Sequence, residues 1–204
     1  IEIRAARASL QQALSVIDWE TERLDRVAWD WASWDQTYDY VVARSPEYVE
    51  INLVSDSLMS MGLNVIAFVT PDGHTVGAVA LDPATGARIT IPELDVHQLP
   101  LDTPWLCPTA NDSVRGILQW RDGPFLFATR PILRSDNSGP VRGTLLMGRY
   151  IDDDLVADWA NITGLEMTLE PLDSPGARAL LAPAGAHIDA GEGLVGPLPA
   201  QQST

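Results

Sequence analysis

The chain has 204 residues, of which 46% are hydrophobic, and its 13 basic and 28 acidic residues give a net charge of −15. So negative a charge repels phosphate backbones and anionic membrane surfaces, which argues against nucleic-acid binding and against docking on such a membrane. Every basic residue is an arginine, which excludes lysine chemistry in this segment, and the single cysteine, Cys107, excludes an intrachain disulfide.

The two ends of the chain suggest a piece of a larger protein. No apolar run approaches the roughly 20 residues that a membrane helix needs, and no signal peptide is visible. The chain opens at Ile1 without an initiator methionine and stops at Thr204 in a stretch rich in proline and glycine. We therefore expect flanking segments in the parent protein.

Residues 1–43 have the pattern of one long helix without proline or glycine. Apolar residues recur every seven positions at Ile3, Leu10, Ile17, Leu24 and Trp31. Such a seam favours supercoiling against a partner helix, and at 1.5 Å per residue the helix would span roughly 65 Å. We expect residues 1–24 to project as a stalk that forms a parallel dimer. A long amphipathic helix lying on its own domain is the alternative.

The stretch 27–40 within this pattern is rich in aromatic residues and aspartate. Helical geometry places one apolar stripe on a narrow face, made of Val27, Trp31, Trp34, Tyr38 and Val42. Asp35 lies at the border of the stripe, whereas Trp29 and Tyr40 point the other way. Two interpretations stay open, because the stripe can pack on the core or form the wall of a ligand site.

The pattern after residue 44 predicts a second helix and then strands. Ser45 and Pro46 begin a helix that ends at Gly62, with Asn52 in its middle. Strand-like segments follow at 64–70, 75–81, 114–120, 125–133 and 142–151. Pro71, Asp72 and Gly73 form the turn of the first hairpin. The segment 82–112 is irregular, carries Trp105, and is long enough to be functional.

The remaining elements are short. The aspartates Asp152–Asp154 begin a helix that runs to about Ile162, and residues 164–170 form a last strand. Pro131 in the fourth strand predicts an edge or a bulge. Residues 171–204 are expected to be a connector, so that the domain proper is 1–170.

Two arginines are candidate functional residues because each interrupts an apolar strand. Arg130 and Arg149 either form structural salt bridges, for instance to Asp35, or face solvent, or hold a ligand carboxylate or phosphate. No phosphate loop, metal-ligand motif or nucleophile motif accompanies them. We expect a non-enzymatic protein without metal or cofactor.

Helices followed by a meander of hairpins indicate an α+β fold with an antiparallel sheet. A PAS-like five-stranded sheet has this order along the chain: two strands, a long connecting segment and three further strands. Fold alone does not define function.

Several motifs in this order resemble a known family. They are Trp34–Tyr38 after the long helix, Asn52-Leu53, Asp72-Gly73, and the stretches 128–133 and 143–149. Together, over about residues 20–170, the chain resembles the CHASE4 domain, an extracytoplasmic sensory domain of bacterial and archaeal signalling receptors.

The resemblance implies a periplasmic sensor held between two membrane helices of an inner-membrane protein. The implied outputs, outside this chain, are cyclic-di-GMP enzymes or histidine kinases. The family supplies no agreed ligand, so the candidate ligand-binding residues come from the patterns above: Trp31, Trp34, Asp35, Tyr38, Asn52, Trp105, Arg130 and Arg149. A ligand-free dimerisation or protein-interaction module is the alternative.

Overall fold

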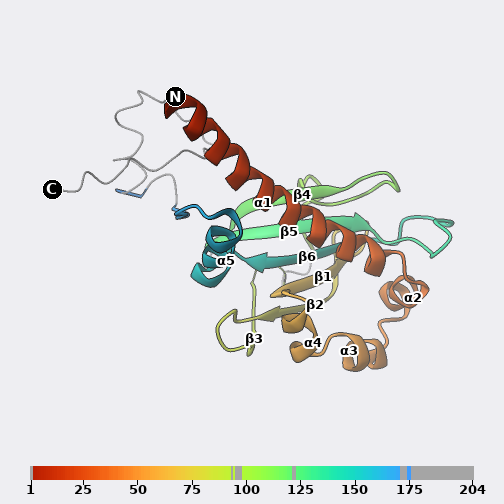
Figure 1. Ribbon diagram of the computed structural model, residues 1–204. Coiled ribbons are helices and arrows are strands. Elements are labelled where there is room, and N and C mark those ends of the chain that lie inside the picture. The colour runs from red at the N-terminus through yellow and green to blue at the C-terminus, as the bar shows by residue number, and fades with distance from the viewer. Residues whose placement is uncertain (1, 93, 95–97, 121–122, 171–173, 176–204) are drawn as a thin grey trace. The chain divides into compact units, whose positions relative to one another are not determined.

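The computed structural model describes residues 2–92, 94, 98–120, 123–170 and 174–175. The chain divides into two compact units, of which one comprises residues 1–20 and 152–204 and the other residues 21–151. Helix α1, Glu2–Ala32, is continuous through both (Figure 1). Among the helices of the described residues, none combines the length and apolarity needed to cross a membrane.

The larger unit, residues 21–151, is built on one antiparallel sheet. Its strands are β1 (Val65–Val69), β2 (Thr75–Leu81), β3 (Arg88–Ile89), β4 (Val114–Trp120), β5 (Gly123–Pro131) and β6 (Thr144–Tyr150). Their order across the sheet is β3-β2-β1-β6-β5-β4. The PAS-like α+β prediction is confirmed, with two-residue β3 as an addition inside the segment expected to be irregular.

Pro131 does not mark an edge strand. Strand β5 lies between β4 and β6, and Pro131 is its last residue, opposite Thr144. A proline at the end of a strand removes no hydrogen bond from the middle of the ladder.

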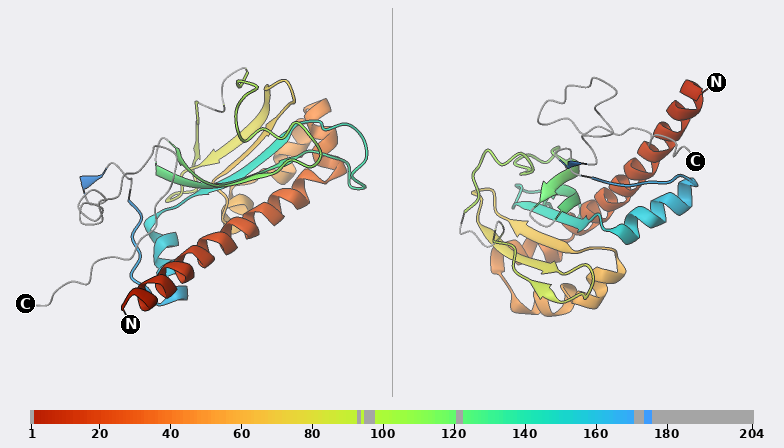
Figure 2. Two further views of the ribbon diagram at one scale, coloured as in Figure 1. Left: turned by 90° about the horizontal axis from the view of Figure 1, so that it is seen from above. Right: turned by 90° about the vertical axis from the view of Figure 1, so that its left-hand side faces the viewer.

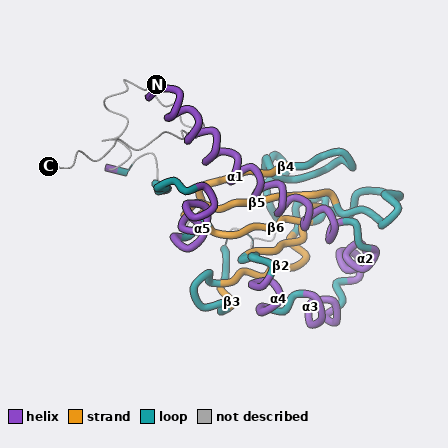
Figure 3. Tube along the Cα trace, in the orientation of Figure 1, coloured by secondary structure: helices purple, strands orange, loops and turns teal. Residues whose placement is uncertain are grey.

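Helices cover one face of this sheet. Residues 21–32 of α1 are followed by α2 (Asp35–Ala43), α3 (Pro46–Asn52) and α4 (Ser55–Ser60) (Figure 3). Figure 2 shows these helices on one side of the sheet, while the connection between β3 and β4 passes on the other side. We call the two sides the helix face and the loop face.

The expected single helix over 1–43 is wrong, because α1 ends at Ala32 and α2 begins at Asp35. The Ala32 carbonyl accepts a hydrogen bond from the Leu133 amide at 3.0 Å. A residue just after β5 therefore takes the place of the next helical turn. The break resets the helical phase. Tyr40, expected to point away from the stripe, is only 5% exposed, whereas Val42 is 62% exposed.

The second expected helix is likewise divided. Ser45 and Pro46 begin α3 as predicted, but Asn52 ends it and α4 begins at Ser55. Tyr48 of α3 stacks on Tyr40 at 4.4 Å, and both rings meet Phe68 edge-on. Stacked and edge-on pairs of this kind join the helices to β1.

The loop face carries an apolar core. Its buried members and the residues packed on them are Val65, Ala67, Ala80, Ile91, Leu94, Phe125, Phe127, Leu146, Tyr150, Trp105, Val114, Leu118 and Trp120. Trp105, Ile91 and Leu94 come from the connection between β3 and β4, so this connection closes the face.

In the smaller unit, α5 (Asp153–Thr163) begins as predicted, with the Asp152 carboxylate accepting from the Leu155 amide at 2.9 Å. The Gln12 side-chain amide of α1 donates to the Thr163 carbonyl at 2.8 Å. The expected strand over 164–170 is wrong, because residues 166–170 have no regular structure. The expected connector 171–204 lies outside the described residues apart from 174–175.

Candidate functional site

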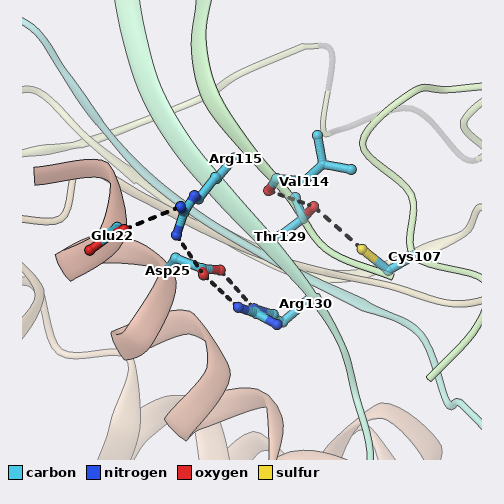
Figure 4. Close-up of polar contacts among 7 residues, drawn as sticks. All are labelled: Glu22, Asp25, Cys107, Val114, Arg115, Thr129 and Arg130. Atoms are coloured by element: carbon cyan, nitrogen blue, oxygen red, sulfur yellow. Dashed lines mark hydrogen bonds and ion pairs between the residues drawn. The ribbon is translucent and has the colours of Figure 1, made fainter. Parts of the chain in front are cut away.

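A buried carboxylate on α1 organises the polar contacts of the helix face. Asp25, 5% exposed, accepts from Arg130 Nε at 2.6 Å and from Arg130 Nη2 at 2.5 Å. Arg115 of β4 reaches the same carboxylate at 3.3 Å and Glu22 at 3.5 Å (Figure 4). Bidentate, charge-assisted geometry of this kind is strong. Arg130 is therefore engaged with Asp25, and the suggested partner Asp35 is wrong.

Arg149 lies on the same face as Arg130 but does not converge with it. Strand register places Leu126 opposite Arg149, and Leu126 and Arg130 are four residues apart on β5. Four residues of strand span about 13 Å. A Cβ at Gly62 would lie 3.3 Å from Arg149 Nη1 and 3.4 Å from Arg23 Nη2, so Arg149 lies under the end of α4. Arg130 and Arg149 therefore do not form a pair.

The aromatic stripe packs against the connection between β5 and β6. Trp31 and Trp34 stack with ring centres 4.9 Å apart. The Tyr38 hydroxyl accepts from Arg142 Nε at 3.0 Å, and Tyr38 is 2% exposed. The Arg134 guanidinium lies 4.3 Å from the centre of the same ring, a cation–π geometry.

Three other predicted residues lie apart from one another. Asp35 is exposed and accepts from the Ser135 amide at 3.2 Å and the Ser135 hydroxyl at 3.0 Å. The Asn52 side chain donates to the Tyr48 carbonyl at 3.1 Å. Trp105 packs on the loop-face core. The eight predicted residues therefore do not form one cluster.

Strand β5 connects the two faces through consecutive residues. Arg130 contacts α1, whereas the Thr129 hydroxyl on the loop face lies 3.4 Å from Cys107 Sγ and donates to the Val114 carbonyl at 3.2 Å (Figure 4). The Cys107 amide donates to the Thr144 hydroxyl at 2.8 Å. Burial, opposed by the Thr129 hydrogen bond, raises the pKa of the Cys107 thiol, so this sulfur is a neutral packing group.

A pocket of about 630 Å³ opens at the edge of β2. We call it the β2-edge pocket. The described residues that line it are Arg44, His74, Thr75, Val76, Gly77, Ala78, Ala80, Ile89, Thr90, Ile91 and Leu94. Strand β3 pairs only with Ala80 and Leu81. The pocket therefore lies where β3 stops and the following segment leaves β2.

None of the eight predicted binding residues lines this pocket. As ligand contacts they stay predictions. Sequence reasoning missed Arg44 because it sits at a helix stop before Ser45 and Pro46, where a solvated arginine is ordinary. It missed Thr75 because nothing local distinguishes it from other strand threonines.

The polar groups of the pocket include Arg44 at the end of α2 and His74 just before β2. Arg44 adopts the left-handed conformation, with φ 54° and ψ 40°, and its amide ends α2 by donating to the Tyr40 carbonyl at 2.7 Å. His74 Nε2 lies 3.5 Å from the Asp72 carboxylate. In the described part of the chain, no cluster of three or more His, Cys, Asp or Glu residues suits a metal ion.

The antiparallel sheet, with helices on one face and a covering connection on the other, defines a PAS-like α+β domain. The sensor domain of histidine kinase DctB from V. cholerae superposes with TM-score 0.55 at 8% identity, covering 75% of this chain and 57% of that one. A domain of a sensory box/GGDEF family protein from Vibrio parahaemolyticus gives TM-score 0.52 at 16% identity, covering 80% and 64%. At these identities the likeness concerns the fold.

The sequence comparisons supply the family. The CHASE4 domain matches residues 16–170, and the chain belongs to the CHASE4 family. The methanogenesis regulatory histidine kinase FilI of Methanothrix harundinacea is 27% identical over 147 residues, which are 72% of this chain but only 16% of that protein. The chain is thus similar to domains of histidine kinase and GGDEF-type receptors, and it spans only part of each.

Proposed function

We propose that this chain is the periplasmic, non-catalytic sensing domain of a membrane-anchored receptor and that it binds a small molecule. The β2-edge pocket carries the proposal, because its volume of about 630 Å³ is within the about 300–1,000 Å³ common for small-molecule sites. The output, a cyclic-di-GMP enzyme or a histidine kinase, lies outside this chain. Membership in the CHASE4 family supports this role.

A route from the sheet to α1 supports the signalling part of the proposal. Thr129 contacts the connection that closes the loop face, and its neighbour Arg130 binds Asp25 of α1. A ligand that shifts this connection would act on the Arg130–Asp25 pair. Because α1 is continuous from Glu2 to Ala32, the change would pass along one helix.

We further propose that the receptor is a parallel homodimer through residues 1–24. Leu10 and Ile17 are half-buried in the single chain, whereas Leu24 is 1% exposed and is not available to a second copy. Contacts would therefore come from the part of the seam that precedes Leu24. Membrane tethering raises the effective concentration of the two copies, so a weak seam is sufficient.

The proposal is tested with a metabolite screen by thermal shift, in which a ligand that binds the native state raises Tm. Ala78 lies exposed on the pocket wall, and Ala78→Trp should fill the pocket and abolish any ligand-induced shift. Ala87→Trp places the same ring on the exposed turn after β2 and should leave the shift intact.

The alternative, a ligand-free dimerisation module, predicts the opposite results. Two results together favour it. The first is that no metabolite shifts Tm, or that Ala78→Trp leaves the ligand-induced shift unchanged. The second is that Leu10→Asp plus Ile17→Asp halves the mass measured by light scattering. Both substitutions lie in the smaller unit and outside the pocket lining.

A further inference from the structure

Thr75 presents a polar atom that the fold leaves unused. Its hydroxyl oxygen is buried and has no hydrogen-bond partner among the described residues, and Thr75 lines the β2-edge pocket. The buried hydroxyls of Thr37, Thr129 and Thr163 are all bonded. A buried hydroxyl without a partner costs free energy, and a ligand in the pocket that Thr75 lines could supply the missing hydrogen bond.

Arg44 presents a second unused group in the same lining. Its guanidinium makes no hydrogen bond or ion pair within the part of the chain that the structure describes. Other arginines of the unit are engaged, as Arg88 donates to the Leu53 carbonyl at 2.7 Å and Arg130 binds Asp25. The guanidinium fork matches a carboxylate in shape and charge.

The charge of the lining is unusual for this chain. The net charge is −15, yet the described residues that line the pocket include an arginine and a histidine and no aspartate or glutamate. Asp72, outside the lining, is the acid beside His74 at 3.5 Å. Its negative charge opposes an incoming anion, which favours a moderate affinity over a tight one.

The rest of the lining is apolar or backbone. Ile91 and Leu94 are buried. The stretch of β2 from Thr75 to Ala78 pairs with β1 on one side, and no strand among the described residues pairs with its other edge, because β3 pairs only further along. An extended ligand could therefore lie beside this edge with its apolar part on Ile89, Ile91 and Leu94.

We propose that the β2-edge pocket binds a small organic carboxylate with an apolar body, held by the Arg44 guanidinium and the Thr75 hydroxyl. The proposal rests on the small-molecule sensing proposed above and adds the chemical class of the ligand. Inorganic anions lack the apolar part, and neutral molecules lack the charge that Arg44 selects.

Titration calorimetry with matched pairs of probes tests this choice. The pairs are N-acetyl-L-leucine with its carboxamide, and hexanoate with hexanamide, each titrated into the 204-residue chain. We expect each carboxylate to bind at least about tenfold more tightly than its amide, since charge-assisted hydrogen bonds are the stronger ones. Arg44→Gln should remove this preference, and Arg26→Gln, the same change at an exposed position of α1, should retain it.

Thr75→Val separates a binding role from a structural one. We expect carboxylate binding to weaken about three- to tenfold, while the Tm of the ligand-free protein stays equal or rises, because an unbonded hydroxyl is removed. A fall in Tm together with unchanged affinity would assign Thr75 to the fold.

Two results would overturn the carboxylate proposal. One is that no carboxylate probe binds. The other is that amides bind as well as carboxylates and Arg44→Gln changes neither; if Ala78→Trp still abolishes binding of both, the sensing pocket stands and only its ligand class is wrong.

Discussion

The helix face of the sheet and the β2-edge pocket use similar residue types for different purposes. On the helix face, Arg130 is bound to Asp25, and Tyr38 contacts two arginines, Arg134 and Arg142. At the pocket, the Arg44 guanidinium and the Thr75 hydroxyl have no hydrogen-bond or ion-pair partner among the described residues. An arginine or aromatic ring thus indicates a ligand only where the fold has not already used it.

The reason for the difference is burial. Asp25 lies between α1 and the sheet, where an unpaired charge would be costly, so two arginines from β4 and β5 neutralise it. The pocket lies at an open sheet edge where the covering segment departs. Water can reach a guanidinium there, and a ligand can replace that water.

The largest effect is expected from removing the Asp25 carboxylate on the helix face. Asp25→Ala leaves Arg130 without its partner, and breaking a buried pair in this way costs about 3–5 kcal/mol of the free energy of unfolding. Urea denaturation measures the loss. Asp30→Ala, on an exposed position of the same helix, should change stability by less than about 0.5 kcal/mol. Equal effects of the two substitutions would show that the network contributes nothing specific.

A smaller effect concerns the tyrosines packed on β1. Burial, opposed by the Thr37 hydrogen bond, raises the pKa of Tyr48 to about 12, and burial also raises the pKa of Tyr40. A folded-state pKa above the unfolded value of about 10 means that this stabilisation is complete below pH 10 and is lost as the pH rises toward 12.

Two pKa units correspond to about 2.7 kcal/mol, which is the upper limit of the expected loss of stability. Urea midpoints measured across this pH window give the slope. Tyr48→Phe should flatten the slope while losing the bond to Thr37, which is 2.8 Å long. An unchanged slope would assign the alkaline loss to other groups.

The smallest effect is expected at Asp35, which the sequence placed beside the aromatic stripe. Asp35→Asn loses an exposed ion pair with Arg134 at 3.7 Å, and such pairs are worth less than about 1 kcal/mol. Chemical denaturation should show almost no change, and ligand shifts in the metabolite screen should persist. Loss of a ligand-induced Tm shift with intact stability would instead show that the aromatic stripe forms part of the ligand site, so that the helix face and not the β2-edge pocket binds the ligand.

The sequence by itself determined the local elements. Alternation and turn chemistry located the five longer strands, and Gly73, with φ 85°, takes the left-handed position of the first hairpin as its sequence predicts. Helix starts at Pro46 and Asp153 followed from the residues that precede them. These features depend on backbone φ preferences and hydrogen bonds within a few residues, so neighbouring residues specify them.

Only the tertiary structure decided where the long helix breaks and which charges meet. Ala32 ends α1 because the Leu133 amide, far along the chain, bonds its carbonyl, and Arg130 meets Asp25 across 105 positions. The pocket likewise exists because β3 stops after two residues while its continuation leaves the sheet. Pairings and cavities of this kind depend on which distant segments reach the same hydrogen-bonding or charged groups. Local residue patterns do not specify which distant segments these are.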